Sequence, residues 1–191
     1  MRTVVVVEGA TDKLALTVAA RRLGRDIEAE EIAITPIGGA HAITRFLAQL
    51  AAEQPRIRIA GMCDEGEEVV FRTALERAGF GSGLSRSELE RLGFFVCSAD
   101  LEDELIRAIG TEAISRLTEL EGDVQAWYTF QRQPAWQGQA AHQQFRRFIR
   151  SVSNRNARYI RAILEALDPA QLPRPLQMLL AHVELRPAGG R

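Results

Sequence analysis

Short apolar runs alternate with segments of helical periodicity over residues 1–110. Four runs rich in β-branched or aromatic residues have the length of strands, and apolar residues recur at helical spacing between them. Strands separated by helices in this way form right-handed βαβ units and a parallel sheet. The predicted strands are 3–7, 32–36, 57–62 and 94–97, and the predicted helices are 11–23, 40–52, 67–78 and 101–109.

After Gly110 the pattern indicates helices only. Residues 139–167 have a helical period with apolar side chains on one face and arginines on the opposite face. Residues after Pro173 have no clear pattern, and 187–191 are typical of a frayed tail. The arginines of the polar face are Arg147, Arg150, Arg158 and Arg161.

The fold class follows from these two patterns. We predict an α/β domain over residues 1–110, with a four-stranded and mostly parallel sheet between helices, and a helical extension with a basic helix over residues 111–191. The 191 residues suffice for one domain with such an extension, and 46% of them are hydrophobic, which is enough for a core.

Composition also bounds the location of the protein. No apolar run reaches the length of a membrane span and no signal segment opens the sequence, so we expect a soluble cytoplasmic protein without a membrane partner. Cys63 and Cys97 end predicted strands and are expected to be buried, reduced thiols.

The net charge of −1 hides an asymmetry between the two halves. Residues 1–123 contain 22 acidic and 14 basic residues, whereas residues 124–191 contain 3 acidic and 10 basic residues. Residues 124–164 carry seven arginines and no acidic residue. Such asymmetry is typical of proteins that contact nucleic acid, so we expect the arginine face to bind phosphates, although a solvated helix surface is the simpler alternative.

Three acidic clusters follow three predicted strands. Because parallel strands end at one edge of a sheet, these clusters should converge, and converged carboxylates repel one another unless a cation lies between them. Oxygen ligands without His or Cys favour Mg²⁺, Mn²⁺ or Ca²⁺. The clusters are Glu8 with Asp12, Asp64 to Glu68, and Asp100 to Glu104.

The helix dipole offers a simpler explanation for part of these clusters. Acidic residues in the first turn of a helix are favoured by the dipole alone, which accounts for Glu67, Glu68, Asp103 and Glu104. Glu8, Asp64 and Asp100 precede their helices, where capping explains less, so we assign these three to a site.

A second candidate site is Gly38-Gly39, at a junction between strand and helix. Its backbone N–H groups would hold a phosphate, or the pair is only a turn. Other site classes are excluded or weakened, since the sequence contains no Walker A motif, no G-x-G-x-x-G after the first strand and no zinc-type Cys/His spacing.

Taken in order, Glu8-Gly9-x-Thr11-Asp12, Gly38-Gly39, Asp64 and Asp100-Leu101-Glu102 resemble the Toprim domain, and most closely the Toprim domain of overcoming lysogenization defect (OLD) family nucleases. The resemblance covers about residues 1–110, with a looser helical match to about residue 165. It implies Mg²⁺-dependent cleavage or transfer at a DNA phosphodiester, with Mn²⁺ as a substitute.

The resemblance also implies roles for single residues. Glu8 would be a metal ligand or a general acid/base and Asp64 a further catalytic group. The implied metal site comprises Glu8, Asp12, Asp64, Glu67, Asp100 and Glu102. The implied phosphate or DNA contacts are Gly38, Gly39, Arg147, Arg150, Arg155, Arg158 and Arg161.

Two positions depart from the pattern that is usual in this family. Gly66 replaces the second acid of the acid-x-acid motif after the third strand, and Asn156 stands where the nuclease branch often carries a lysine. Asn156 falls on the apolar, inward face of the predicted helix, so we include it among the candidate catalytic positions.

Two hypotheses therefore remain open. The first is a Mg²⁺-dependent DNA endonuclease or nicking enzyme, and the second is a Toprim-fold module that binds DNA or assembles with other proteins without turnover. The candidate partners are DNA, a separately encoded ATPase and a second copy of the chain. A phospho-acceptor domain centred on Asp64 is disfavoured, because no lysine stands at a late strand end.

Overall fold

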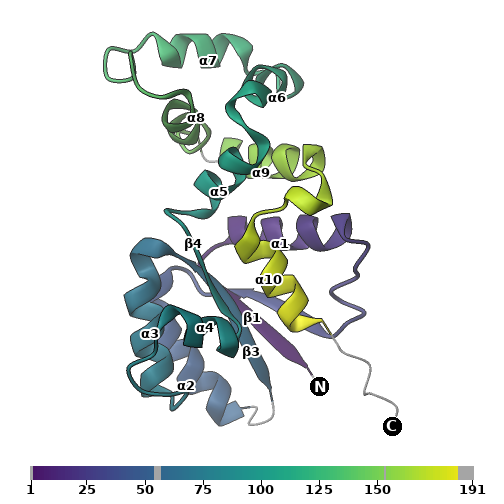
Figure 1. The fold of residues 1–191 in the computed structure, drawn as a ribbon, viewed down its shortest axis with the longest axis vertical. Helices are drawn as coiled ribbons and strands as arrows, with labels where there is room; N and C mark the ends of the chain where they lie inside the picture. Colours follow the sequence, from purple (N-terminus) through teal and green to yellow (C-terminus); the bar gives the residue numbers. More distant parts are fainter. Residues whose placement is uncertain (1, 54–56, 153, 185–191) are drawn as a thin grey trace.

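The computed structural model describes residues 2–53, 57–152 and 154–184. Its centre is a four-stranded parallel sheet with the strand order β2-β1-β3-β4 (Figure 1). All four strands lie where the sequence predicts them, and the third continues two residues further, so that Asp64 is its last residue. The strands are β1 (Thr3–Val7), β2 (Ile32–Pro36), β3 (Arg58–Asp64) and β4 (Phe94–Cys97).

The central strand β1 is buried along its whole length. It pairs with β2 on one side and β3 on the other, with Val5 opposite Ile34 and Ala60. Because side chains alternate across a strand, Val5 and Val7 join one core cluster while Val4 and Val6 join another. Residues 4–7 of this strand therefore need apolar side chains on both faces of the sheet.

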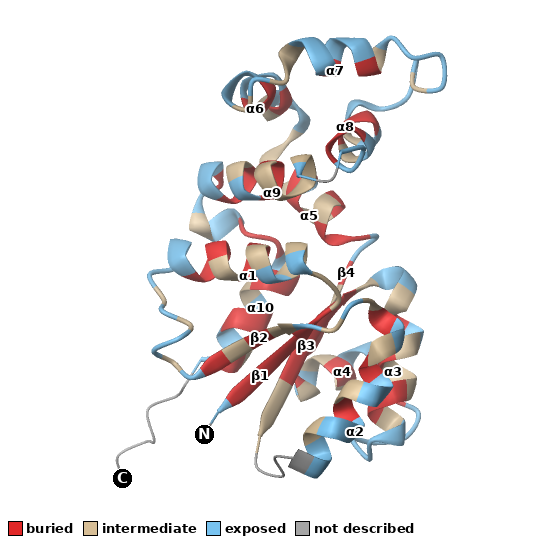
Figure 2. Ribbon diagram, turned by 180° about the vertical axis from the view of Figure 1, so that it is seen from behind, coloured by how far each residue is buried: buried red, intermediate tan, exposed pale blue. Residues whose placement is uncertain are grey.

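Helices cover both faces of the sheet (Figures 1 and 2). On one face lie α1 (Ala10–Arg22) and α10 (Arg174–Val183), and Val5 and Val7 pack among their buried residues. The opposite face is covered by α2 (Ile43–Glu53), α3 (Glu68–Arg77) and α4 (Arg86–Leu92). The architecture is thus an α/β sandwich of three layers, as the alternation of strands and helices predicts.

A helical lobe stands beyond the carboxyl edge of the sheet (Figure 1). Its core is aromatic: the Trp127 ring lies 5.6 Å from the Phe145 ring and 5.2 Å from the Phe148 ring, and Phe145 lies 5.3 Å from Tyr159. The lobe comprises α5 (Leu101–Ile109), α6 (Ile114–Leu120), α7 (Val124–Gln131), α8 (Ala141–Ile149) and α9 (Arg155–Ala166).

Short 3-10 turns complete the described chain. They are η1 (Ala40–Ala42), η2 (Glu65–Glu67), η3 (Thr111–Ala113) and η4 (Pro169–Gln171). Cys63 and Cys97 are buried free thiols, as expected. Within the described ranges no helix combines the length and the apolar character that a bilayer crossing requires.

The expectation of one helical face over residues 139–167 is wrong. Helix α8 ends at Ile149 and α9 begins at Arg155, which places the arginines of the predicted face on two helices and in the turn between them. Val152, assigned to the apolar face, is 45% exposed in that turn. Periodicity alone did not reveal the break, because the apolar spacing resumes in phase after it.

The expectation of weak structure after Pro173 is also wrong. Residues 174–183 form α10, whose Leu176 and Leu179 are fully buried. Pro175 lies in the first turn of α10, where its missing N–H has no helical partner to lose, so it starts this helix rather than breaking it. A boundary at residue 110 stays a prediction, although residues on both sides of it share one core cluster. The predicted tail, 187–191, lies outside the described residues.

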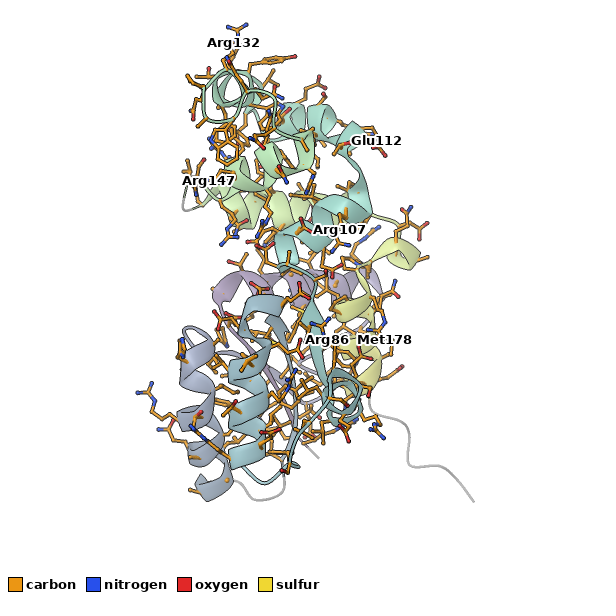
Figure 3. All side chains as sticks on the ribbon, turned by 60° about the vertical axis from the view of Figure 1, so that its left-hand side comes forward. Arg86, Arg107, Glu112, Arg132, Arg147 and Met178 are labelled. Atoms are coloured by element: carbon orange, nitrogen blue, oxygen red, sulfur yellow. The ribbon has the colours of Figure 1, made fainter. Side chains whose placement is uncertain are left out.

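Burial of α10 makes a prediction about stability. Leu179→Ala should lower the free energy of unfolding by about 2–5 kcal/mol, because it opens a cavity beneath the sheet. Met178→Ala is the matched control, since Met178 is 41% exposed and labelled at the surface in Figure 3, and it should change stability by about 0.5 kcal/mol or less. Urea unfolding measures both. Equal small effects would show that α10 does not pack on the sheet in solution.

Candidate active site at the carboxyl edge of the sheet

A cavity of about 390 Å³ opens where the strands end and the helical lobe begins. The carboxyl ends of β1 and β3 and the first turns of α1 and α5 supply part of its lining. The turn after α8 and the first turn of α9 supply the rest. The cavity is lined by Glu8, Gly9, Thr11, Asp12, Asp64, Glu102, Arg150, Val152 and Asn156.

The loop after β1 fixes two of the four carboxylates. Gly9 caps α1 in an extended conformation, and its N–H donates to Asp12 Oδ2 at 2.8 Å. The N–H of Asp64 donates to Glu8 Oε1 at 3.1 Å, which ties the ends of β1 and β3 together through a side chain. Both carboxylates are thereby oriented by backbone groups rather than by cations.

The carboxylates in the cavity are difficult to ionise together. Burial raises the pKa of Asp64 from 3.8 to about 8, and the nearby charges of Glu8 and Asp12 add to the rise. Burial likewise raises the pKa of Asp12 to about 6, with Glu8 and Glu102 adding to it. The pKa of Glu8 is raised as well, by burial and by Glu67, against the lowering effect of the Asp64 N–H. A cation in this cavity would favour the charged forms.

Asn156 and Glu102 contact one another in the lining of the cavity. The amide nitrogen of Asn156 donates to Glu102 Oε1 at 2.6 Å, a contact that sets the orientation of the amide. The Asn156 carbonyl oxygen is buried and has no hydrogen-bond partner among the described residues. A buried acceptor without a donor is typical of a place where a water, an ion or a ligand group completes the site.

The donor set of the cavity suits a hard divalent cation, since Glu8, Asp12, Asp64, Glu102 and the amide oxygen of Asn156 all offer oxygen. The geometry is not preassembled. Among the described residues no group of three Asp, Glu, His or Cys side chains is arranged so that it could hold one metal ion. Glu8, Asp64 and Glu102, which were predicted to converge, nevertheless line one cavity. Their role as metal ligands stays a prediction.

Comparison with known proteins shows what this arrangement is similar to. Residues 1–65 match the sequence profile of the overcoming lysogenization defect protein-like TOPRIM domain. Over these residues the chain is similar to that Toprim domain. No curated protein matches the sequence.

Solved structures share the fold over nearly the whole chain. The C-terminal region of the Xanthomonas campestris pv. campestris OLD protein matches with a TM-score of 0.70 at 21% identity, covering 95% of this chain and 94% of that one. The C-terminal region of the Burkholderia pseudomallei OLD protein matches with a TM-score of 0.67 at 16% identity, covering 95% and 96%. The helical lobe and α10 thus belong to the same overall fold as the Toprim sheet.

Asp100 does not offer its carboxylate to the Toprim cavity, contrary to the sequence-based assignment. It is the N-cap of α5, accepting the Asp103 N–H at 2.9 Å, and it accepts Arg146 Nε at 3.0 Å and Arg150 Nη1 at 2.6 Å. Burial raises the pKa of Asp100, but the bonds from Arg146 and the Asp103 N–H outweigh it and hold the pKa below its ordinary value. Asp100 is thus a helix cap and an arginine partner.

Glu67 does not line the cavity. It belongs to η2, and its charge contributes to the raised pKa of Glu8. Its neighbour Glu68 forms ion pairs with Arg72 and Arg86, in keeping with the structural role that its place at the start of α3 suggests. Only the first acid of the cluster after β3, Asp64, reaches the cavity.

The Gly38-Gly39 amides are already occupied. The N–H groups of Gly38 and Gly39 donate to the carbonyl oxygen of Glu8, at 3.1 and 3.0 Å. Both glycines adopt positive φ angles, of 78° and 109°, which allows the chain to fold back toward β1. The expectation that these N–H groups hold a phosphate is therefore wrong, and the turn instead fixes the backbone at Glu8.

The candidate arginines separate into three environments. Arg150 lines the cavity, whereas Arg147, labelled in Figure 3, and Arg161 are exposed on the lobe. Arg158 donates to Asp123 Oδ2 at 2.8 Å, and Arg155 donates to the same oxygen at 3.2 Å while its guanidinium lies over the Phe148 ring. Contact of these arginines with DNA stays a prediction, but they do not form one continuous face.

Sequence reasoning missed Arg146, the arginine that shares the Asp100 carboxylate with Arg150. Its Nε lies 3.0 Å from both oxygens of Asp100. The spacing of Arg146 and Arg150, one helical turn apart, is the signal that could have indicated a common partner. The pairing itself depends on α8 lying beside α5, which local pattern does not specify.

The raised pKa of Asp64 predicts how stability depends on pH without metal. Between about pH 4 and pH 8 the folded chain holds a proton that the unfolded chain has released, so stability falls as the pH rises through this window. Asp64→Asn removes the ionisable group and with it this loss of stability at higher pH. In EDTA, its melting temperature should rise relative to wild type from pH 5 to pH 9. A difference that does not grow with pH would mean that Asp64 ionises freely.

Proposed function

We propose that this chain is a Mg²⁺-dependent nuclease module that hydrolyses phosphodiester bonds in DNA and accepts Mn²⁺ in place of Mg²⁺. The observation that supports it most directly is the set of four carboxylates lining one cavity of an OLD-like Toprim domain. Two of them have pKa values raised to about 6 and about 8, so the cavity lacks the positive charge that would keep them all ionised. A divalent cation supplies that charge.

Each carboxylate has a role in this proposal. Asp12, Asp64 and Glu102 would hold the cation, with the amide oxygen of Asn156 as a further oxygen donor. When bound, the cation neutralises charge on the phosphate and acidifies a coordinated water. Glu8, oriented by the Asp64 N–H and raised in pKa, would serve as a ligand or exchange a proton at the reacting oxygens.

The helical lobe would contribute the DNA contacts. Arg147 and Arg161 are exposed, and each phosphate contact on a duplex contributes about 0.9 to the dependence of log affinity on log salt concentration. The same proposal includes a second copy of the chain, a cytoplasmic location and a separately encoded ATPase, since this sequence contains no Walker A motif of its own for that last role.

Cleavage of supercoiled plasmid tests the nuclease proposal. With Mg²⁺ or Mn²⁺ the wild-type chain should nick DNA, and Glu8→Gln should reduce the rate to about 1% or less, in line with losses of 10²–10³ for single charge-stabilising groups. Glu112→Gln is the control, because Glu112 is exposed at the start of the lobe (Figure 3). Cleavage that persists in Glu8→Gln would indicate a contaminant or another site.

Calorimetry separates metal binding from turnover. Mn²⁺ should bind the wild-type chain, and Asp64→Ala and Glu8→Ala should each weaken binding, because each removes a carboxylate from the cavity. If both variants bind Mn²⁺ as tightly as wild type, the cavity is not the metal site.

A second function, a Toprim module without turnover, is favoured by two positions. Gly66 leaves the loop after β3 without the second acid of the family pattern, and Asn156 brings a neutral amide to Glu102 where a lysine would bring a charge. Such a module would bind metal and DNA and act through a partner. Metal binding without nicking by the wild-type chain would support this alternative.

Asn156→Lys distinguishes the two functions. Because the Asn156 amide already reaches Glu102, an ammonium at this position should reach the carboxylates and raise the nicking rate, by roughly 10-fold or more if charge stabilisation limits it. Asn154→Lys is the matched control: the same chemical change at an exposed residue two positions away, which should leave the rate unchanged. A folded Asn156→Lys chain with an unchanged rate would show that the missing charge does not limit cleavage.

A further inference from the structure

Arg150 is the one cationic side chain among the residues that line the carboxylate cavity. Four carboxylates share the same lining, so an approaching phosphodiester is repelled by those that are ionised. A bound cation offsets part of that repulsion, but an anionic substrate also needs a donor that contacts its outer oxygens. The position of Arg150 at the wall of the cavity makes it the group best placed for this contact.

The Arg150 side chain contacts Asp100 through one nitrogen and is partly exposed to solvent. Nη1 donates to Asp100 Oδ2 at 2.6 Å, while 47% of the side chain is exposed. An arginine side chain carries five N–H donors in a planar fork, and among the described residues one bond, to Asp100, uses this fork, so most of its donor capacity is left for another partner. A fork of this kind matches the paired oxygens of a phosphate.

The Asp100 carboxylate is held in place by groups other than Arg150. Its carboxylate is buried, caps α5 through the Asp103 N–H, and receives Arg146 Nε at 3.0 Å from both oxygens, with a further bond from Arg146 Nη2. Arg146 alone therefore neutralises Asp100. The second arginine leaves a net charge of +1 on the group of three side chains, beside a cavity that is otherwise acidic.

We propose that Arg150 binds the phosphate of the DNA substrate in the carboxylate cavity, and that Asp100, held by Arg146, is a positioning residue for the Arg150 guanidinium. The proposal rests on the proposed function for its ligand, a DNA phosphodiester. It assigns to Asp100 the orientation of an arginine rather than the binding of a metal. A purely structural ion pair would not require the second arginine, since Arg146 already occupies both oxygens of Asp100.

DNA binding without cleavage tests the role of Arg150. A fluorescein-labelled duplex is titrated with the full chain in Ca²⁺, which takes the same oxygen ligands as Mg²⁺. Arg150→Ala should weaken binding several-fold and lower the salt slope by about 0.9, the value of one phosphate contact. Arg150→Lys should keep the salt slope but bind less tightly than wild type, because it retains the charge and loses the fork.

The matched control is Arg91→Ala. Arg91 is 73% exposed on α4 and lies 3.6 Å from Glu88, so its loss removes one positive charge without touching the cavity. Its affinity and salt slope should equal those of wild type. Melting temperatures confirm folding of each variant, and if Arg150→Ala unfolds, Arg150→Gln replaces it as the uncharged variant.

A double-mutant cycle tests the positioning role of Asp100. Asn is also a good N-cap, so Asp100→Asn should preserve the start of α5. It should weaken DNA binding in the wild-type background and have no further effect in the Arg150→Ala background, because there is then no guanidinium to position. Equal effects in both backgrounds would overturn the positioning role, since a merely structural residue acts independently of Arg150.

Binding and cleavage distinguish this inference from the proposed function. Arg150-dependent DNA binding by a chain that never nicks DNA would support the inference and reject the nuclease proposal. The opposite result is also distinguishable. If nicking depends on Glu8 but Arg150→Ala leaves the DNA affinity, the salt slope and kcat/KM unchanged, the nuclease proposal is supported and the inference about Arg150 is rejected. Absence of any DNA binding by the wild-type chain would overturn the inference.

Discussion

Parallel strands that end at one edge bring negative charge together, and this constraint governs the site. Glu8 follows β1, Asp64 ends β3 and Glu102 lies in the first turn of α5 after β4, yet they line one cavity because the three strands point the same way. Burial raises the pKa of Asp64 to about 8, and repulsion from the neighbouring carboxylates adds to the rise. The fold thus holds carboxylates close together, and a bound cation would reduce their repulsion. Without a cation this arrangement lowers the free energy of unfolding.

The helical lobe completes the cavity rather than simply extending the domain. Helix α9 brings Asn156 to Glu102, and the turn after α8 brings Arg150 to Asp100. The position of α9 depends on its packing against α1 and α5 through Tyr159, Ile160 and Ile163, which belong to the core shared with the sheet. A change in that packing would alter the distance between the carboxylates and the groups that face them.

The sequence predicted the features that depend on local pattern. All four strands were predicted because apolar runs of strand length are bounded by turns. That the acidic residues after these strands lie at one edge of the sheet was predicted from the parallel direction of the strands. It could not predict that the Gly38 and Gly39 amides are taken by Glu8, or that Asp100 is shared by two arginines, because both depend on contacts between distant segments. Helix α10 was missed because the residues after Pro173 were expected to be weakly structured, whereas Pro175 sits in the first turn of a helix.

The four consecutive valines of β1 have a consequence for the register of the sheet. A shift by one residue exchanges the two faces of a strand, and in most strands that exchange places polar side chains in the core. In β1 the exchange would replace valine with valine, so burial alone discriminates weakly between the two alignments. Glu8 discriminates strongly, since its carbonyl oxygen accepts the Gly38 and Gly39 N–H groups and its carboxylate accepts that of Asp64. Glu8 therefore fixes the register of the central strand in addition to lining the site. A substitution that removes its carboxylate should be examined for heterogeneous strand pairing as well as for lost activity.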